Sequence, residues 1–287
     1  MGSLTVRLAR RGDRKKIKKM LEDDAAYARV PLKDLDHILS SRLVLVATDG
    51  EHTKGALVSI WPCPPSAWLD ALAVEPGPAG DDVADALLDA FEEHAARKGV
   101  RQVLCSIEAR NDEAARGSLV ARGFRLLTQF IRYEKEDFDV PAFDAPEVAI
   151  AAADQGELSA IHRIEKACFE PPWRDDRSRL KAMMRRYPHF RVALLNGAIA
   201  GFAYSAIDNA MVGQFVRLAV DPAARGRNAA KALLADAIDF FDHRGVRHIE
   251  TRTERNNPAA RRLFTSFGFR RKGPHRDIFC KHLDRSC

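Results

Sequence analysis

The pattern of apolar and polar positions in the second half of the chain predicts alternating helices and strands. Asp154 and Glu157 form a capping-box signature, and the apolar stripe that follows them has helical spacing, so we expect a helix there. Residues 191–195 and 201–205 alternate like strands and flank Asn196-Gly197, a dipeptide typical of a hairpin turn. The helical stripe consists of Leu158, Ile161, Ile164 and Cys168.

Further along, a strand, a helix, a strand and a helix follow one another. Residues 215–220 predict a strand that runs directly into a helix over 230–241, where apolar residues keep the helical spacing. Residues 247–253 predict the next strand, and Asn257 and Gly268 delimit another helix. This order predicts a mixed α/β domain with a largely antiparallel sheet.

The chain aligns with itself at an offset of about 146 residues, which indicates two copies of one domain. Residues 73–76 (Ala-Val-Glu-Pro) fall on 219–222 (Ala-Val-Asp-Pro). After a one-residue shift, residues 123–125 fall on 268–270, and both read Gly-Phe-Arg. The predicted domains are residues 1–140 and 146–287, joined within 138–146.

Composition places the chain among ordinary globular proteins, because 46% of its 287 residues are hydrophobic and 30% are charged. No stretch approaches the ~18 to 20 apolar residues of a membrane-spanning helix, and the amino terminus lacks the apolar core of a signal peptide. We therefore expect a cytoplasmic protein without a membrane partner. The five cysteines form no Cys-x-x-Cys pair, and among nine histidines only His243 and His248 have ligand spacing, on different predicted elements. We assign no metal.

Charge differs sharply between the halves. Residues 1–150 carry 21 Lys and Arg against 25 Asp and Glu, whereas residues 151–287 carry 25 against 15. The positive second half indicates an anionic ligand or a solvated basic face.

The turn after strand 215–220 carries the most informative residues. Small side chains there leave backbone N–H groups of the helix start uncovered, which together with the helix dipole suits a phosphate. Arg225, Arg227 and Lys231 add positive charge. Taken alone, these residues fit a phosphate cradle and an ordinary solvated turn equally well.

Three signatures in the second half resemble the Gcn5-related N-acetyltransferase (GNAT) superfamily. Residues 225–230, Arg-Gly-Arg-Asn-Ala-Ala, resemble its acyl-CoA loop, with Asn228 in place of the central glycine. Asparagine tolerates left-handed backbone better than most residues. Residues 165–173, with Glu165, Phe169 and Trp173, are similar to the substrate-side loop of ribosomal-protein N-terminal alanine acetyltransferases. The third signature comprises Asn257, Ala260, Leu263, Phe264, Gly268 and Phe269, with Phe264 in place of tyrosine.

The resemblance implies two tandem GNAT domains, each a mixed, mostly antiparallel, splayed sheet flanked by helices, with acetyl-CoA as the acyl donor. It places CoA in the cleft where the fourth and fifth strands splay apart. Backbone groups of the fourth strand would bind the pantetheine and polarise the thioester, and amides of the loop would bind the pyrophosphate. The residues implied are Leu218, Ala219, Val220, Arg225, Gly226, Arg227, Asn228, Ala229, Ala230, Lys231, Asn257 and Phe264.

The first copy is acidic at the position of this loop. Residues 79–85 bring Asp81, Asp82 and Asp85 where the second copy has Arg227, Asn228 and Lys231. One carboxylate and a phosphate charge ~6 Å apart repel each other by roughly 3 kcal/mol at an effective dielectric near 20. We therefore predict a degenerate first domain that supports the second or shapes its cleft.

For proton transfer we favour Glu250 as the base, because residues 248–252 resemble the strand that bears the glutamate of the alanine acetyltransferases. Phe264 follows Glu250 by fourteen positions, about two more than the family pattern expects. Either the loop between them is longer here, or Arg252 occupies the position of the family's glutamate. Glu254 or a water is the alternative base, and Glu250 also fits an exposed carboxylate paired with an arginine. The tyrosine that usually acts as the general acid is absent, and we expect its absence to lower the reaction rate on the order of 100-fold.

The function that these features predict is acetyl transfer to a primary amine, a peptide amino terminus or a lysine, in the second domain. Trp173 and Phe169 fit either an acceptor wall or packing, and Cys168 fits the core better than an acyl carrier. The alternatives are a non-catalytic acyl-CoA sensor or scaffold, and a small-molecule amine acetyltransferase like the mycothiol synthases, which the sequence resembles less. We place the variable substrate loops at 169–186 and 206–212.

Nucleic-acid binding is a third class, drawn from basic residues late in the chain. No aromatic-interleaved surface accompanies them, so solvation or the CoA 3′-phosphate explains them better. The sequence predicts no oligomeric state. These residues are Arg247, Arg252, Arg255, Arg261, Arg262, Arg270, Arg271 and Lys272.

Overall fold

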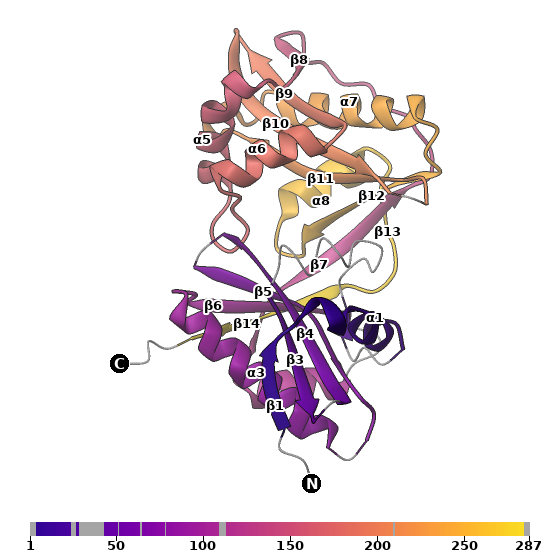
Figure 1. The fold of residues 1–287 in the computed structure, drawn as a ribbon. Coiled ribbons are helices and arrows are strands. Elements are labelled where there is room, and N and C mark those ends of the chain that lie inside the picture. Colours follow the sequence, from indigo (N-terminus) through magenta and orange to yellow (C-terminus); the bar gives the residue numbers. More distant parts are fainter. Residues whose placement is uncertain are drawn as a thin grey trace. The chain divides into compact units, whose positions relative to one another are not determined.

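The computed structural model divides the chain into two compact units (Figure 1). The first contains Met1–Leu127 and Arg276–Cys287, and the second contains Thr128–His275. The structure describes residues 4–23, 27–28, 43–50, 52–63, 65–77, 79–108, 113–208 and 210–283.

The first unit has a mixed sheet with strand order β1-β3-β4-β5-β6-β14. Among its described pairs only β5 and β6 run parallel. Helix α3 packs on one face of the sheet and α1 on the other, each against its own apolar cluster. The strands are β1 (Leu4–Leu8), β2 (Tyr27–Ala28), β3 (Leu43–Asp49), β4 (His52–Cys63), β5 (Ser66–Val74), β6 (Gln102–Glu108) and β14 (Arg276–His282); the helices are α1 (Arg14–Asp23), α3 (Gly80–Arg97) and α4 (Glu113–Ala121).

The second unit repeats this plan with strand order β7-β12-β11-β10-β9-β8. Only β11 and β12 run parallel among its described pairs, so the predicted mixed, mostly antiparallel sheet is confirmed. The strands are β7 (Arg125–Lys135), β8 (Val148–Ala152), β9 (His189–Leu195), β10 (Ala198–Ile207), β11 (Val212–Val220), β12 (His248–Glu254) and β13 (Arg270–Arg271), which pairs with β7; the helices are α5 (Leu158–Cys168), α6 (Arg177–Arg186), α7 (Ala229–His243) and α8 (Pro258–Ser266).

Alternate residues of the strands in the second unit separate two cores. Val192 and Phe202 pack with α5 and α6, whereas their neighbours Ala193 and Ala203 pack with α7 and α8. This alternation is the two-residue period of a strand that is covered on both faces. Figure 1 shows α5 and α6 in front of the strands of this sheet.

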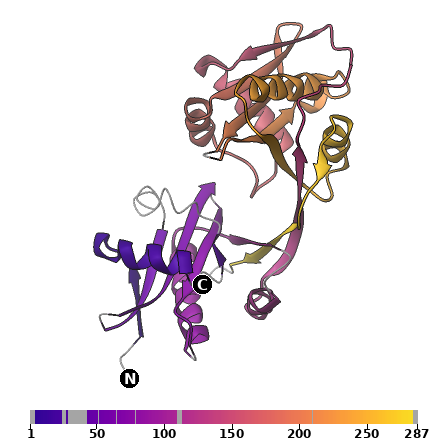
Figure 2. The same ribbon diagram turned by 90° about the vertical axis from the view of Figure 1, so that its right-hand side faces the viewer.

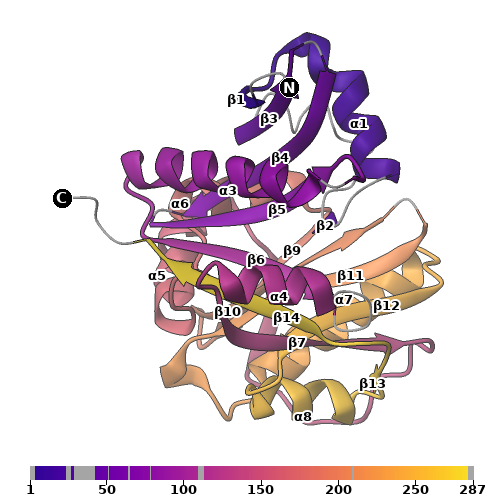
Figure 3. The same ribbon diagram turned by 90° about the horizontal axis from the view of Figure 1, so that it is seen from below.

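The last strand of each sequence repeat belongs to the unit of the other repeat. Strand β7, which ends the first repeat, pairs with β12 in the second unit, and β14, which ends the second repeat, pairs with β6 in the first. Figure 2 shows β7 in magenta running upward, and Figure 3 shows the yellow β14 beside β6. The compact units therefore differ from the predicted bounds 1–140 and 146–287, and residues 138–146 lie within the second unit.

Local sequence signals match the observed elements closely. Asp154 and Glu157 form the capping box, Asn196 and Gly197 both have positive φ at the hairpin, and Asn257 caps α8. The expectation of a substrate loop over 169–186 is wrong in its second part. Residues 177–186 form α6, because Asp176 caps its amino terminus by accepting a hydrogen bond from the Arg179 amide.

Among the described residues, no helix combines the length and apolar character that crossing a bilayer requires.

We predict that Gly213→Ala destabilises the second unit by about 1 to 3 kcal/mol. A Cβ at Gly213 would lie 2.7 Å from Cδ1 of Phe241, a fully buried ring of α7. Urea unfolding followed by fluorescence measures the loss. The double variant with Phe241→Leu should lose less than the sum of the two single changes. Strict additivity would contradict this close approach.

Candidate active site

Strands β11 and β12 pair only at their beginnings and then separate. The parallel register covers Val212–Phe215 against His248–Thr251, although β11 continues to Val220 and β12 to Glu254. The Thr251 hydroxyl donates to the Phe215 carbonyl at 2.9 Å where the pairing ends. On the other side of β11, a register shift against β10 leaves Val216 unpaired and 44% exposed. The fork expected between the fourth and fifth strands is present.

The loop from β11 to α7 uses left-handed backbone at two positions. Gly226 has φ +81° and Asn228 has φ +61°, and α7 begins at the next residue, Ala229. Asn228 stands where the family signature has glycine, and it adopts the conformation that asparagine tolerates. Its side-chain amide donates to the carbonyl of Asp144 at 2.7 Å, which fixes the loop against residues 143–147.

The cations of this loop differ in their surroundings. Arg225 is exposed and lies beside the Cys168 thiol. Burial raises the pKa of this thiol, and the Arg225 guanidinium opposes part of that rise. Arg227 pairs with Glu147 at 2.6 Å, and the Lys231 ammonium lies 6.0 Å from the centre of the Phe143 ring. Arg225 is therefore the predicted phosphate ligand with the most accessible charge.

The first unit has a corresponding fork between β5 and β6, and strand β2 of the same unit occupies it. Strands β5 and β6 pair only over Ser66–Leu69 and Gln102–Cys105. Beyond that point β2 pairs with β5 at Ala71 and Leu72, the positions that align with Arg217 and Leu218.

The helix that follows this fork in the first unit has an acidic amino terminus. Asp81 and Asp82 lie in the first turn of α3, where carboxylates themselves complement the helix dipole. One turn later Asp85 and Asp89 both pair with Arg122. Negative charge thus occupies the region where the second unit presents basic residues.

The proposed base, Glu250, lies beside three basic side chains. Its carboxylate is 3.3 Å from Arg132 Nη1, 3.5 Å from His248 Nε2 and 3.9 Å from Arg252 Nη2, and it is 13% exposed. Glu250 lies opposite Gln214 on β11, one residue before the fork opens. The carboxylate is therefore both ion-paired, as one interpretation of the sequence had it, and close to the fork.

Glu254 lies four residues further along the same face of β12, opposite Phe130 of β7. Burial raises its pKa, and burial is the sole cause of the rise. A carboxylate with a raised pKa accepts protons more readily, so Glu254 is a chemically credible alternative base.

Glu250 and two side chains near it could approach a metal ion. Glu134, His248 and Glu250 place ligand atoms within 4.8 Å of one another. Lys272 lies 3.5 Å from Glu134, and Arg132 lies beside Glu250, so cations already neutralise both carboxylates. We assign no metal there, and the predicted absence of a metal stays a prediction.

Phe264, which replaces the family tyrosine, is buried in an aromatic cluster. Its ring is 5.9 Å from Tyr133, 6.2 Å from Phe215 and 5.6 Å from Phe269, measured between centroids. Asn257 uses its side chain to cap α8. The position of the family's usual acid therefore carries hydrophobic packing.

The loop that the sequence predicts on the acceptor side is anchored by a buried ion pair that sequence reasoning did not identify. Glu165 of α5 is fully buried and pairs with Arg217 of β11. Arg217 also donates to the Trp173 carbonyl at 2.7 Å and lies 3.6 Å above the Phe169 ring. Burial raises the pKa of Glu165, and Arg217 opposes that rise. A charged residue inside strand 215–220 was the available signal.

The loop reaches across the fork to β7. The Trp173 ring packs edge-on against Phe130, with 5.2 Å between the centroids. Trp173 and Phe169 are both partly buried, so the structure brings the two predicted acceptor residues together around Arg217.

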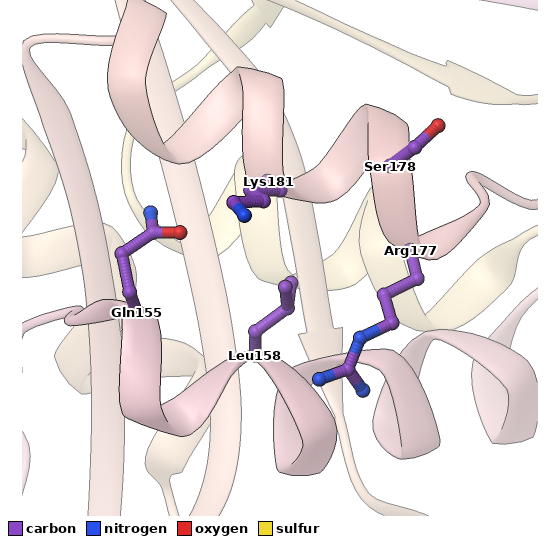
Figure 4. A pocket seen from close by; sticks show the side chains of 5 residues that line it. All are labelled: Gln155, Leu158, Arg177, Ser178 and Lys181. Atoms are coloured by element: carbon purple, nitrogen blue, oxygen red, sulfur yellow. The ribbon is translucent and has the colours of Figure 1, made fainter.

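A separate pocket of about 410 Å³ lies between α5 and α6. In Figure 4 the polar ends of Gln155, Arg177 and Lys181 surround the space above Leu158, whereas the Ser178 hydroxyl points away. None of these residues is a predicted catalytic or CoA-binding residue, although Arg177, Ser178 and Lys181 fall within the predicted substrate loop 169–186.

Comparison with known proteins identifies the family. The Acetyltransferase (GNAT) family model matches residues 158–269. The ribosomal protein bS18-alanine N-acetyltransferase of Escherichia coli K12 is 30% identical over 122 residues, which are 42% of this chain and 79% of that protein. The chain belongs to the GNAT family of N-acetyltransferases.

Other relatives extend the comparison of this GNAT protein. The mycothiol acetyltransferase of Beutenbergia cavernae is 35% identical over 74 residues, 26% of this chain and 25% of that protein. A solved tandem GNAT protein from the clavulanic acid biosynthesis pathway superposes with a TM-score of 0.71 at 16% identity, over 99% of this chain and all of that chain. The tandem GNAT fold predicted from the sequence is confirmed.

We predict that Arg217→Met costs about 3 to 5 kcal/mol of unfolding free energy, because it leaves the Glu165 carboxylate buried without a partner. Urea denaturation measures the loss. The double variant Arg217→Met/Glu165→Gln should regain most of it, since the glutamine can still accept from the Asp175 amide. A double variant no more stable than Arg217→Met would refute the ion-pair account.

Proposed function

We propose that the second unit is an acetyl-CoA-dependent N-acetyltransferase that acetylates a primary amine, either a peptide amino terminus or a lysine. The observation that carries this proposal is the contrast between the two forks. Strand β2 pairs beside Leu72 in the first unit. Within the described residues, no strand occupies the corresponding position beside Leu218 of the second unit. The second fork therefore offers a stretch of β11 backbone beside which a pantetheine arm can pair.

The loop after β11 fits the anionic end of CoA. Its backbone turns at Gly226 and Asn228 to begin α7, and Arg225 adds an exposed positive charge. Backbone amides at a helix start, together with the helix dipole, favour phosphate groups. In the first unit the aspartates at the start of α3 would repel the same phosphates.

In the proposed reaction the amine forms an amide bond with the acetyl carbonyl, and the thioester bond breaks. Glu250 takes the proton from the amine, directly or through a water, and Glu254 is the alternative base. Backbone groups of Leu218–Val220 hold the pantetheine and polarise the carbonyl. Because Phe264 offers no proton, the sulfur leaves as a thiolate, whose ordinary pKa near ~8.5 permits this.

Trp173 and Phe169 form the proposed acceptor wall. A peptide acceptor is supported by the E. coli relative, which is named for a ribosomal protein alanine, and a small-molecule amine by the mycothiol relative. A non-catalytic acyl-CoA sensor is the other candidate, because the tyrosine position carries Phe264. Turnover of any amine decides against the sensor. Cytoplasmic localisation stays a prediction.

We expect calorimetric titration to detect one acetyl-CoA site per chain, and Arg225→Glu to weaken it on the order of 100-fold, because charge reversal replaces attraction to phosphate by repulsion. Arg185→Glu on α6 is the matched control, since Arg185 is also exposed and changes charge equally. Two sites per chain, or unaltered binding by Arg225→Glu, would contradict the proposed cradle.

We expect Glu250→Gln to lower kcat by on the order of 100- to 1,000-fold while acetyl-CoA affinity is kept, because the amide cannot accept the proton. Glu254→Gln should have a much smaller effect. The reverse order identifies Glu254 as the base. In that case burial has raised the pKa of the base, and kcat/KM should fall with acidification at a higher pH than an ordinary glutamate gives.

A further inference from the structure

One face of the β7–β12 ladder carries three side-chain pairs in succession. The pairs lie directly opposite one another, and neighbouring pairs are two residues apart on each strand, so all six side chains share this face. The residues between them face the core that contains α8. In order along the strands, the pairs are Glu134–Glu250, Arg132–Arg252 and Phe130–Glu254.

The middle pair places two positive charges against each other. Like charges at directly opposed positions destabilise a sheet, so this arrangement needs compensation. Glu250 supplies part of it, 3.3 Å from Arg132 and 3.9 Å from Arg252. Glu134 lies 3.5 Å from Lys272, whose ammonium is also 3.2 Å from Glu136, so Glu250 is the carboxylate that lies beside both arginines.

Both arginines remain accessible to a ligand. Their side chains are 34% and 44% exposed, whereas Glu250 between them is 13% exposed. A guanidinium presents a planar fork of donors that matches a carboxylate. Two such forks on one open face can therefore bind a second carboxylate beside Glu250.

This arginine pair lies between the two candidate bases. Its Cα atoms lie two residues along the strand, roughly 7 Å, from the Glu250 pair on one side and from the Glu254 pair on the other. Trp173 packs on Phe130 at the Glu254 end and marks the acceptor side. An amine placed beside either glutamate would therefore hold a group of its own near Arg132 and Arg252.

We propose that Arg132 and Arg252 bind a carboxylate of the amine acceptor, so that the acceptor is an acidic amine. This inference rests on the proposed function and deepens it. An acidic side chain next to a peptide amino terminus and a small ω-amino acid are two sources of such a carboxylate.

The subsite also gives the first repeat a part in specificity. Arg132 and Phe130 lie on β7, the last strand of the first repeat, whereas Arg252 lies on β12 of the second. The proposed acceptor site therefore depends on the exchanged strand.

The test is calorimetric binding of matched ligand pairs to the full chain in the presence of CoA. One pair is a short peptide beginning Ala-Glu and its Ala-Gln counterpart, both amidated. The other is 5-aminopentanoic acid and its amide. In at least one pair the carboxylate ligand should bind about tenfold more tightly to the wild type, and the arm that shows this identifies the source of the carboxylate.

Variants of the cluster should change the preference for the carboxylate ligand in different directions. Arg252→Gln and Arg132→Gln should each abolish it, whereas Glu250→Gln should strengthen carboxylate binding because it removes the internal competitor for the arginines. Arg262→Gln, on the exposed face of α8, is the matched charge control and should keep the preference. Loss of fold alone would not move Glu250→Gln and Arg252→Gln in opposite directions.

Equal binding of both members in both pairs overturns the subsite, and so does the absence of measurable binding by either carboxylate ligand. A preference that survives both arginine substitutions overturns it as well. These outcomes differ from failure of the proposed function, in which the wild type does not bind acetyl-CoA or acetylates no amine.

Discussion

The fork between β11 and β12 is the constraint on which the rest of the second unit depends. Parallel pairing holds the strands together as far as Phe215 and Thr251 and then stops, and the Thr251 hydroxyl satisfies the Phe215 carbonyl at that point. The unpaired Val216 shifts the register of β11 against β10 just beyond it. Backbone polar groups that leave a ladder need other partners. The separated strand edges are therefore suited to bind an extended ligand, with the proposed phosphate loop at the end of one strand and α8 after the other.

Because the last strands are exchanged, each repeat contributes side chains to the unit of the other. Strand β7 completes the second sheet and brings Ile131 and Tyr133 to the core under α8, while Phe130 and Arg132 reach the opposite face. The first repeat has filled its own fork with β2 and has an acidic helix start, yet its last strand contributes to the proposed site of the second. The first repeat thus supplies the second sheet with a strand and one side of the proposed site.

Local signals made much of this fold predictable from the sequence. The capping box at Asp154, the hairpin at Asn196 and the cap at Asn257 each depend on residues within a few positions, so short patterns carry them. The exchange was not predictable, because both repeats end in similar strands and either partner satisfies the same ladder. The site divides in the same way. The loop around Asn228 follows a local pattern, whereas the pairing of Glu165 with Arg217 joins residues 52 positions apart.

The buried Phe264 also bears on which amine the site can serve. Its ring packs among Tyr133, Phe215 and Phe269, so α8 presents no phenol to the departing sulfur. The proposed reaction then relies on a neutral nucleophile, on the backbone around the thioester and on a single carboxylate. An α-amine with a pKa near ~8 is partly neutral at physiological pH, whereas a lysine near ~10.4 is almost wholly protonated. Within the proposed function, the lack of an acid on α8 therefore favours an amino terminus over a lysine as the acceptor.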